Sequence, residues 1–365
     1  MNTSPKYFID PDIRKAETLP SAFYRSDTVY EELKKKIFAR SWQLICDTDK
    51  IKIPGTIYPF TMLEGYLNEP LLLTRDLEDK VHCLSNVCTH RGNILVESSD
   101  VVNNMKCRYH GRRFELNGCF RSMPECEDAL SFPRPEDNLS SVPFEIWNKF
   151  IFASIAPKLA HQSVFKAVSN SLEGVNAGEM TYEPTRSRDY LVRCNWALYV
   201  ENYLEGFHIP YVHSSLNEVI DYGAYTTELY DHSSLQLGIA KPGEECFSMN
   251  EVSPYYGSEI AAFYWWIFPN LMLNFYPWGL SINIIRPLAK DLTKVSFLTY
   301  VSDNTKLDKG AGAGLDRVER EDEAIVEMVQ RGMQSSFYST GRYSPKREQG
   351  VHHFHRLIAQ YLNNE

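Results

Sequence analysis

Two short segments in the first third of the chain each pair one cysteine with one histidine. Cys88 and His90 form a C-x-H pair, and Cys107 and His110 form a C-x2-H pair, with residues 91–106 between them. Each pair comes from a turn after a strand-like run, so two hairpin tips could hold one metal centre. Thiolates and imidazoles are soft ligands that favour metals such as zinc and iron.

Two kinds of metal centre use this ligand set. A structural zinc ion is held tetrahedrally by all four side chains. A Rieske [2Fe–2S] cluster takes two thiolates on one iron and two imidazoles on the other. Zinc fingers pair their cysteines and histidines separately, whereas each loop here supplies one of each, so the pattern favours the cluster. Gly92 and Gly111 follow the histidines and would let backbone N–H groups approach the bridging sulfides.

A second set of metal-ligating residue types follows near the middle of the chain. The segment ENYLEGFHIPYVHS contains Asn202, Glu205, His208 and His213 in the order N-x2-E-x2-H-x4-H. Histidines at this separation on an ideal helix diverge by about 140°. The helix must therefore bulge or break if both face one metal, and Pro210 between them is a reason for it to do so. The alternative is an amphipathic helix with two surface histidines.

A carboxylate would complete a 2-His-1-carboxylate triad, which leaves positions on an iron open for other ligands. The helix predicted over 311–333 contains an apolar stripe, and Asp322 falls on that stripe. A carboxylate on a core-facing stripe is costly unless it is paired or bound to a metal. The alternative is a buried Asp held by an Arg or by the backbone. The stripe residues are Leu315, Val318, Ile325 and Val329, and the acidic residues predicted to be solvated are Glu321, Glu323 and Glu327.

These motifs together resemble the Rieske non-haem iron oxygenases, the ring-hydroxylating oxygenase alpha-subunit family. Respiratory Rieske proteins carry an extra cysteine in each loop, where this chain has Asn93 and Tyr109. Two positions depart from the family. Arg112 follows His110 and Gly111 of the second Cys/His loop, where the family usually has Trp, and Glu205 stands where most members have Asp. In having Glu at position 205, the chain resembles the choline, carnitine and betaine monooxygenase branch of the family.

The resemblance implies a role for each residue. Cys88, His90, Cys107 and His110 would hold the [2Fe–2S] cluster, and His208, His213 and Asp322 would hold a mononuclear Fe(II). Asp322 precedes Gln330 at the distance the family uses. Glu205 would bridge a cluster histidine to an iron histidine, with Asn202 beside it in the catalytic motif. The family passes electrons between neighbouring subunits, which implies a head-to-tail homotrimer.

The elements that must position these residues indicate an α+β protein. Short strand-like runs fill 42–156, and strands dominate again over 225–301. The resemblance implies an all-β Rieske domain inserted near the N-terminus of a helix-grip (START-like) catalytic domain with an antiparallel sheet. The predicted domains are 1–41, the N-terminal helical part of the catalytic domain; 42–156, the Rieske domain; and 157–365, the catalytic domain. A strand is predicted over 186–200, a flawed helix over 201–216, a loop over 133–141, and a final helix over 348–362, with His352, His353 and His355 on its polar face.

Composition limits the partners. The 365 residues carry a net charge of −9 without a basic stripe, which argues against binding nucleic acid. No signal peptide is recognised, and the most apolar stretch, Ala261–Leu273, is interrupted by Pro269, so we expect a cytoplasmic protein and no membrane partner. No dinucleotide fingerprint is present, so NAD(P)H chemistry should belong to a separate flavin or iron–sulfur reductase.

The predicted function is that of a Rieske mono- or dioxygenase component, which uses O2 and reductase-supplied electrons to oxidise a small organic substrate. The aromatic stretch YWWIFPNLMLNFYPWGL could cage a quaternary or methylated ammonium compound, although most of its rings should pack in the sheet core. The reaction would be N-demethylation, hydroxylation or C–N cleavage. The alternatives are an aromatic ring-hydroxylating dioxygenase alpha subunit, a Rieske electron carrier without oxygenase activity, and a zinc-stabilised scaffold.

Overall fold

The computed structural model describes residues 6–172, 175–249 and 251–363. The chain folds as two units, one formed by Ala39–Lys158 and the other by the described residues of Met1–Phe38 and Leu159–Glu365. The first unit therefore interrupts the second in sequence. Within the described residues, no helix is both long and apolar enough to cross a membrane.

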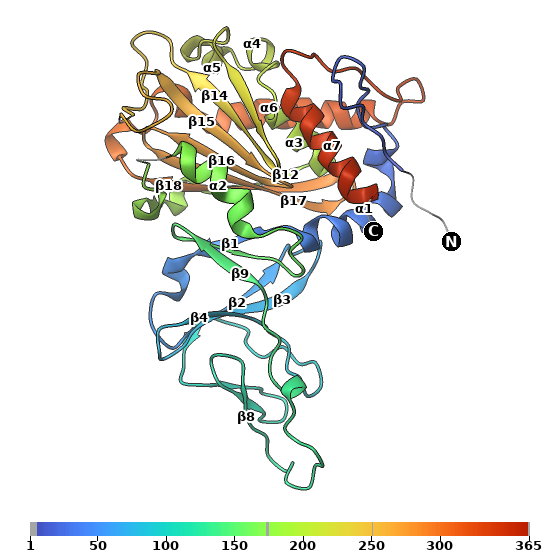
Figure 1. The fold of residues 1–365 in the computed structure, drawn as a ribbon, viewed down its shortest axis with the longest axis vertical. Coiled ribbons are helices and arrows are strands. Elements are labelled where there is room, and N and C mark those ends of the chain that lie inside the picture. The colour runs from blue at the N-terminus through green and yellow to red at the C-terminus, as the bar shows by residue number, and fades with distance from the viewer. Residues whose placement is uncertain (1–5, 173–174, 250, 364–365) are drawn as a thin grey trace. The chain divides into compact units, whose positions relative to one another are not determined.

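The Ala39–Lys158 unit is an all-β module of antiparallel strands (Figure 1). Its core packs Leu72, Leu84 and Phe114 together with the side chains of Cys88 and Cys107. The two cysteines are thus placed by the same apolar burial that holds the module together. The sheets have the orders β1-β10-β9, β4-β3-β2-β5 and β6-β7-β8. The strands are β1 Gln43–Asp47, β2 Thr56–Met62, β3 Glu69–Arg75, β4 Val81–Ser85, β5 Asp100–Val101, β6 Met105–Lys106, β7 Arg113–Phe114, β8 Phe120–Ser122, β9 Phe144–Trp147 and β10 Phe150–Ala153.

The other unit is built on an eight-stranded antiparallel sheet with the order β11-β18-β17-β16-β15-β14-β13, and β12 also pairs with β18. The sheet register sets Tyr264 opposite Asn274 and Asn274 opposite Ser281, so polar and aromatic side chains of neighbouring strands share one face. The strands are β11 Thr181–Tyr182, β12 Arg188–Val192, β13 Thr226–Tyr230, β14 Ser233–Ile239, β15 Ile260–Ile267, β16 Leu271–Tyr276, β17 Gly279–Ala289 and β18 Leu292–Val301.

Helices pack with this sheet: α3 contacts strand β17 and the helices α6 and α7. Long helix α6 and the antiparallel sheet therefore enclose α3, the helix that leads to the predicted histidines. The predicted α+β class, with an all-β module and a second unit built on an antiparallel sheet, is confirmed. The helices are α1 Asp27–Lys36, α2 His161–Ser171, α3 Trp196–Tyr203, α4 Ile209–Val212, α5 Ser214–Val219, α6 Leu315–Gly332 and α7 Gln349–Asn363.

Three local predictions were wrong. The strand predicted over 186–200 ends at Val192, and a helix begins at Trp196 because the Asn195 side chain accepts the Ala197 N–H as its cap. The loop predicted over 133–141 contains a short 3-10 helix at Pro135–Asp137. The histidine face of α7 is not solvated, since His352 and His355 are buried.

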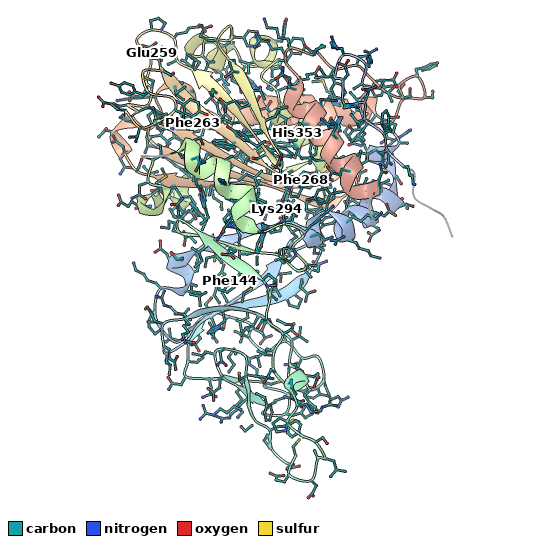
Figure 2. All side chains as sticks on the ribbon, viewed as in Figure 1. Phe144, Glu259, Phe263, Phe268, Lys294 and His353 are labelled. Carbon is teal, nitrogen blue, oxygen red and sulfur yellow. The ribbon has the colours of Figure 1, made fainter. Side chains whose placement is uncertain are left out.

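Tertiary packing explains the buried face of α7. The helix contacts α1, α3 and β13, so its polar residues meet protein on several sides. His355 receives a hydrogen bond from the Tyr343 hydroxyl at 2.6 Å, and its ring lies 3.0 Å from a Glu201 carboxylate oxygen. Phe268, the residue after β15, also contacts α7, since its ring lies 4.9 Å from that of Tyr361 on the helix. Figure 2 labels Phe268 and His353, which is on the same helix.

Candidate active site and metal centres

The two Cys/His loops of the β module have the same backbone design. In each loop the cysteine N–H donates to the carbonyl of the residue after the glycine at 2.8 Å, and the glycine N–H donates to the cysteine carbonyl at 3.0 Å. Gly92 and Gly111 adopt φ of 70° and 77°, the left-handed region that favours glycine. The glycine amides close their own turns. That these glycines let other backbone N–H groups approach the bridging sulfides stays a prediction.

The four predicted cluster residues meet between these loops. The His90 and His110 rings lie 4.7 Å apart, and Cys88 and Cys107 are each only 2% exposed. The Asn93 amide contacts the Cys107 sulfur at 3.6 Å. Among the described residues, buried His110 Nδ1 has no hydrogen-bond partner. Buried thiols and an unsatisfied imidazole nitrogen fit a metal cluster, because the cluster would supply the missing partners.

The spacing of these ligands favours two irons over one zinc. Ligand atoms on a single tetrahedral ion lie within about 4 Å of one another. In the described parts of the chain, only His208, His213 and Asp322 have their ligand atoms gathered within 4.8 Å, and the Cys/His loops do not form such a group. A [2Fe–2S] cluster holds its thiolates and its imidazoles on different irons, so it can be held by a wider arrangement of ligands.

Arg112, the residue that departs from the family, is buried inside the module. Its guanidinium donates to the Asp137 carboxylate at 2.7 Å and to the Asp137 carbonyl at 3.0 Å. The Thr89 hydroxyl from the other loop donates to the same carbonyl at 2.8 Å. Three aromatic rings surround the guanidinium, with the nearest, Phe120, at 4.8 Å. The Pro135–Asp137 turn therefore connects both loops, and the hydrogen bond from Arg112 lowers the pKa of the Asp137 carboxyl.

The second predicted site forms where α3 stops. Helix α3 ends at Tyr203, and α4 is a single helical turn. Pro210 is the second residue of α4, where the backbone N–H has no partner within the helix, so its absence loses no hydrogen bond. His208 precedes this turn and His213 follows it in a non-helical conformation. The predicted break in the helix is therefore confirmed, and it directs both imidazoles to the same point.

The ligand atoms of His208, His213 and Asp322 form a compact triangle. His208 Nε2 lies 3.1 Å from His213 Nε2, His213 Nε2 lies 3.0 Å from Asp322 Oδ1, and His208 Nε2 lies 3.5 Å from that oxygen. Adjacent ligands of an octahedral ion with bonds of ~2.1 Å are separated by about 3.0 Å. The triangle therefore has the size of one octahedral face, which is the donor set of a facial triad.

Neighbouring side chains hold each member of the triangle. The Asn202 amide donates to Asp322 Oδ1 at 2.6 Å, and a Glu205 carboxylate oxygen lies 2.7 Å from His208 Nδ1. The other Glu205 oxygen accepts the backbone N–H groups of Phe207 and His208. Such contacts fix the tautomer and the orientation of a metal-binding imidazole.

Sequence reasoning missed one of these supports. Glu321 lies 2.8 Å from His213 Nδ1, so its predicted solvation was wrong. Burial opposes a charge on His213, but the Asp322 and Glu321 carboxylates raise its pKa overall. Glu323 and Glu327 are also not simply solvated, since Glu323 is partly buried and Glu327 accepts the Arg193 N–H at 2.9 Å.

The predicted stripe on α6 was correct near Asp322 and wrong further along. Val329 is exposed, whereas Val326 and Gln330 are buried. Gln330 accepts the Asn195 N–H at 2.7 Å, which ties α6 to the start of α3. The buried side of α6 therefore differs from the predicted apolar stripe in its last turns, where the helix packs on α3 and buries a polar residue.

The triangle opens into a small cavity. Its volume is about 90 Å³. Five tyrosines line it, two from the aromatic stretch of the sequence: Tyr199, Tyr203, Tyr225, Tyr264 and Tyr276. Glu319 and Gln236 also line it, and neither was identified from the sequence. The position of Glu319, one helical turn before Asp322, was the available signal.

Comparisons with known proteins agree with this geometry. Residues 179–364 match the family described as "Ring hydroxylating alpha subunit (catalytic domain)", and residues 41–134 match "Rieske [2Fe-2S] domain". The chloroplastic choline monooxygenase of Amaranthus tricolor is 30% identical over 358 residues, covering 95% of this chain and 78% of that protein. The carnitine monooxygenase oxygenase subunit of Escherichia coli (strain K12) is 26% identical over 387 residues, covering 100% of both. The crystal structure of the quaternary ammonium Rieske monooxygenase CntA in complex with L-carnitine has the same fold, with a TM-score of 0.76, 22% identity and 99% of each chain covered.

The chain therefore belongs to the Rieske ring-hydroxylating oxygenase alpha-subunit family. It is an oxidoreductase with a Rieske [2Fe–2S] domain and the catalytic domain that carries mononuclear iron in this family. The predicted enzyme class and cofactors are confirmed. The zinc scaffold and the electron carrier are less well supported, because the catalytic domain matches as well as the Rieske domain.

Proposed function

We propose that this protein is the oxygenase component of a system that oxidises a small quaternary or methylated ammonium compound with O2. The observation that carries the proposal is the facial triangle of His208, His213 and Asp322, which opens on a small tyrosine-lined cavity. Aromatic faces attract quaternary ammonium groups. The choline and carnitine monooxygenases among the relatives support the same substrate class.

The assignment of residues follows from the geometry. We propose that Cys88, Cys107, His90 and His110 hold the cluster, and that His208, His213 and Asp322 hold Fe(II). When bound, the cluster supplies single electrons and the mononuclear iron supplies the chemistry of O2 activation. Asn202 positions Asp322 through its 2.6 Å hydrogen bond, and Glu205 positions the His208 ring through Nδ1. The tyrosines hold the substrate next to the triangle and exclude water.

The partners and setting are also proposals. We propose an NAD(P)H-dependent flavin or iron–sulfur reductase as electron donor, a cytoplasmic location, and a homotrimer in which Glu205 meets a cluster histidine of the next subunit. The segment around Glu205 is partly exposed, with Phe207 39% and Tyr211 81% exposed, which supports such a contact. The functional domains would be residues 1–41, 42–156 and 157–365.

A substrate screen tests the proposed function. The iron-loaded protein is supplied with NADH and a surrogate Rieske reductase, and substrate-dependent O2 consumption is measured with ammonium compounds and with aromatic acids. We expect coupled O2 consumption with at least one small methylated ammonium compound and none with aromatic acids. Turnover of aromatic acids alone would instead establish the ring-hydroxylating dioxygenase alternative.

Substitution of Glu205 tests its positioning role. Glu205→Gln keeps an oxygen that can accept from His208 but removes the charge. We expect turnover to fall by about 10–100-fold, with the contents of iron and sulfide unchanged, because partners of metal-bound histidines contribute that much. Rapid-mixing spectroscopy should show slowed oxidation of the reduced cluster in the presence of substrate. Unchanged kinetics would remove Glu205 from the electron path.

A further inference from the structure

Apart from the two histidines of the triangle, the ionisable side chains that could add a strong charge to the catalytic cavity are all acidic. The lining contains the carboxylates of Glu205, Glu319 and Asp322, and it contains no Lys or Arg among the described residues. Glu205 and Asp322 contact the histidines of the triangle, whereas Glu319 contacts neither histidine. The charge of Glu319 is therefore not used by the metal site.

Glu319 lies in the cavity, and among the described residues of the lining no Lys or Arg accompanies it. Its carboxylate accepts the Tyr199 hydroxyl at 2.7 Å. Burial and the nearby Asp322 carboxylate raise its pKa well above the ordinary value for Glu. A bound cation would reverse this effect, because an opposite charge nearby favours the ionised carboxylate.

Tyrosine rings provide the complementary surface. The Tyr264 ring lies 6.0 Å from that of Tyr276 in an edge arrangement and 6.5 Å from that of Tyr225. The Tyr203 hydroxyl is already hydrogen-bonded, to Asn274 Oδ1 at 2.7 Å and to the Trp265 carbonyl at 3.1 Å. A carboxylate and several aromatic rings around one small space are suited to a compact cation.

Gln236 offers one unused acceptor. Its side-chain NH2 donates to the Tyr203 carbonyl at 2.6 Å, and only the nitrogen end can make that bond, so the oxygen end is identified. Gln236 is 1% exposed, and within the described residues its Oε1 has no partner. A buried unsatisfied acceptor is costly, and a ligand hydroxyl would satisfy it where a ligand carboxylate could not.

We propose that this cavity selects a quaternary ammonium alcohol without a carboxylate, with its cation between the tyrosines and Glu319 and its hydroxyl donating to Gln236 Oε1. This inference rests on the proposed function. A betaine or carnitine carboxylate would meet the Glu319 carboxylate, which no histidine contact offsets, and no Lys or Arg among the described residues that line this space.

The neighbouring cavity, which shares Leu315 and Glu319 with the first, does not offer a carboxylate site either. Its two arginines face acidic residues of their own. Arg186 makes two hydrogen bonds to Asp308, at 2.7 and 2.8 Å, and Arg188 lies 3.9 Å from Asp316. Together with Glu319, the carboxylates there outnumber the arginines.

Ligand pairs that differ in one group test the proposal. Binding of each ligand to the holoenzyme is measured anaerobically by calorimetry, and kcat/KM is measured with O2. The ligands are choline, its uncharged isostere 3,3-dimethyl-1-butanol, choline methyl ether, glycine betaine and L-carnitine. We expect choline to bind at least about 10-fold more tightly than each of the others, because each lacks the cation, lacks the hydroxyl donor or adds a carboxylate.

Two variants assign the effects to residues. Glu319→Gln should reduce the preference for choline over its uncharged isostere, and Gln236→Met should reduce the preference for choline over its methyl ether, each by about 10-fold. Each ratio is taken within one variant, so a less stable variant still reports it. Tighter binding or faster oxidation of betaine or L-carnitine would overturn this inference and leave the proposed function intact, whereas no binding or oxidation of any ammonium compound would overturn both. Wild-type ratios in both variants would also overturn the inference.

Discussion

Asp322→Ala should abolish the oxygenase reaction while leaving the cluster in place. The substitution removes one corner of the triangle, where Asp322 Oδ1 lies 3.0 Å from His213 and 3.5 Å from His208. Two imidazoles alone bind iron weakly, so we expect loss of the mononuclear iron. Substrate-dependent turnover should fall by about 10²–10³-fold or more, since a catalytic metal contributes several kcal/mol to the barrier.

Metal and sulfide analysis distinguishes this outcome from unfolding. Acid-labile sulfide and the EPR signal of the reduced cluster should stay at wild-type levels, because the cluster residues are in the other folding unit. Glu327→Gln is the matched control, since it removes a carboxylate from the same helix and keeps an oxygen to accept the Arg193 N–H. Full iron content with wild-type turnover in Asp322→Ala would refute the assigned triad, and a pure electron carrier would show no dependence on this residue.

Arg112→Met should destabilise the β module by about 3 kcal/mol, because removing one partner of a buried ion pair leaves the other without compensation. The Arg112 side chain is 3% exposed and that of Asp137 is 11% exposed. Arg112 lowers the pKa of Asp137 in the folded state, so the contribution of the pair is complete above the ordinary Asp pKa of 3.8 and is lost as the pH falls below it. Unfolding at neutral pH therefore measures the whole effect.

Denaturant unfolding, followed by loss of the visible absorbance of the cluster, measures this difference. Arg121→Met is the control, because Arg121 pairs with Glu115 at 3.4 Å in the same module but both side chains are more than a third exposed. Such surface pairs contribute between 0 and about 1 kcal/mol. The double variant Arg112→Met with Asp137→Asn should recover part of the loss. Equal midpoints for Arg112→Met and Arg121→Met would exclude a stabilising role for the buried pair.

The residues proposed to bind metals were recognisable because most of their chemistry is local. Cysteine and histidine pairs in short loops have few structural uses, and the separation of His208 and His213 required a helix break that Pro210 made reasonable. Asp322 was identified because a carboxylate on an apolar stripe demands an explanation. The β module and the late antiparallel strands were identified from short alternating runs and turn residues.

Other residues that support these sites, unlike Asn202 and Glu205, were not recognisable, because their roles depend on contacts between segments distant in the sequence. Glu321 was predicted to be solvated but contacts His213 across 108 positions of the chain. Burial of His355 depends on α7 meeting α1, α3 and β13. The 3-10 turn at Pro135–Asp137 gains its importance only because both cluster loops hydrogen-bond to Asp137.

Sequence alone determined the class of this protein: an α+β Rieske oxygenase, its two iron sites and the residues that could ligate them. The Cys/His pairs and the two histidines were evident from side-chain chemistry at short spacing, whereas Asp322 was identified from its helical stripe and the class from the resemblance to a family. The tertiary structure alone decided how Arg112 replaces the family's Trp, by pairing with Asp137 inside the module. It also decided which groups face the substrate, because α6, β14, β15 and β16 bring Glu319, Gln236, Tyr264 and Tyr276 around one cavity from positions far apart in the chain.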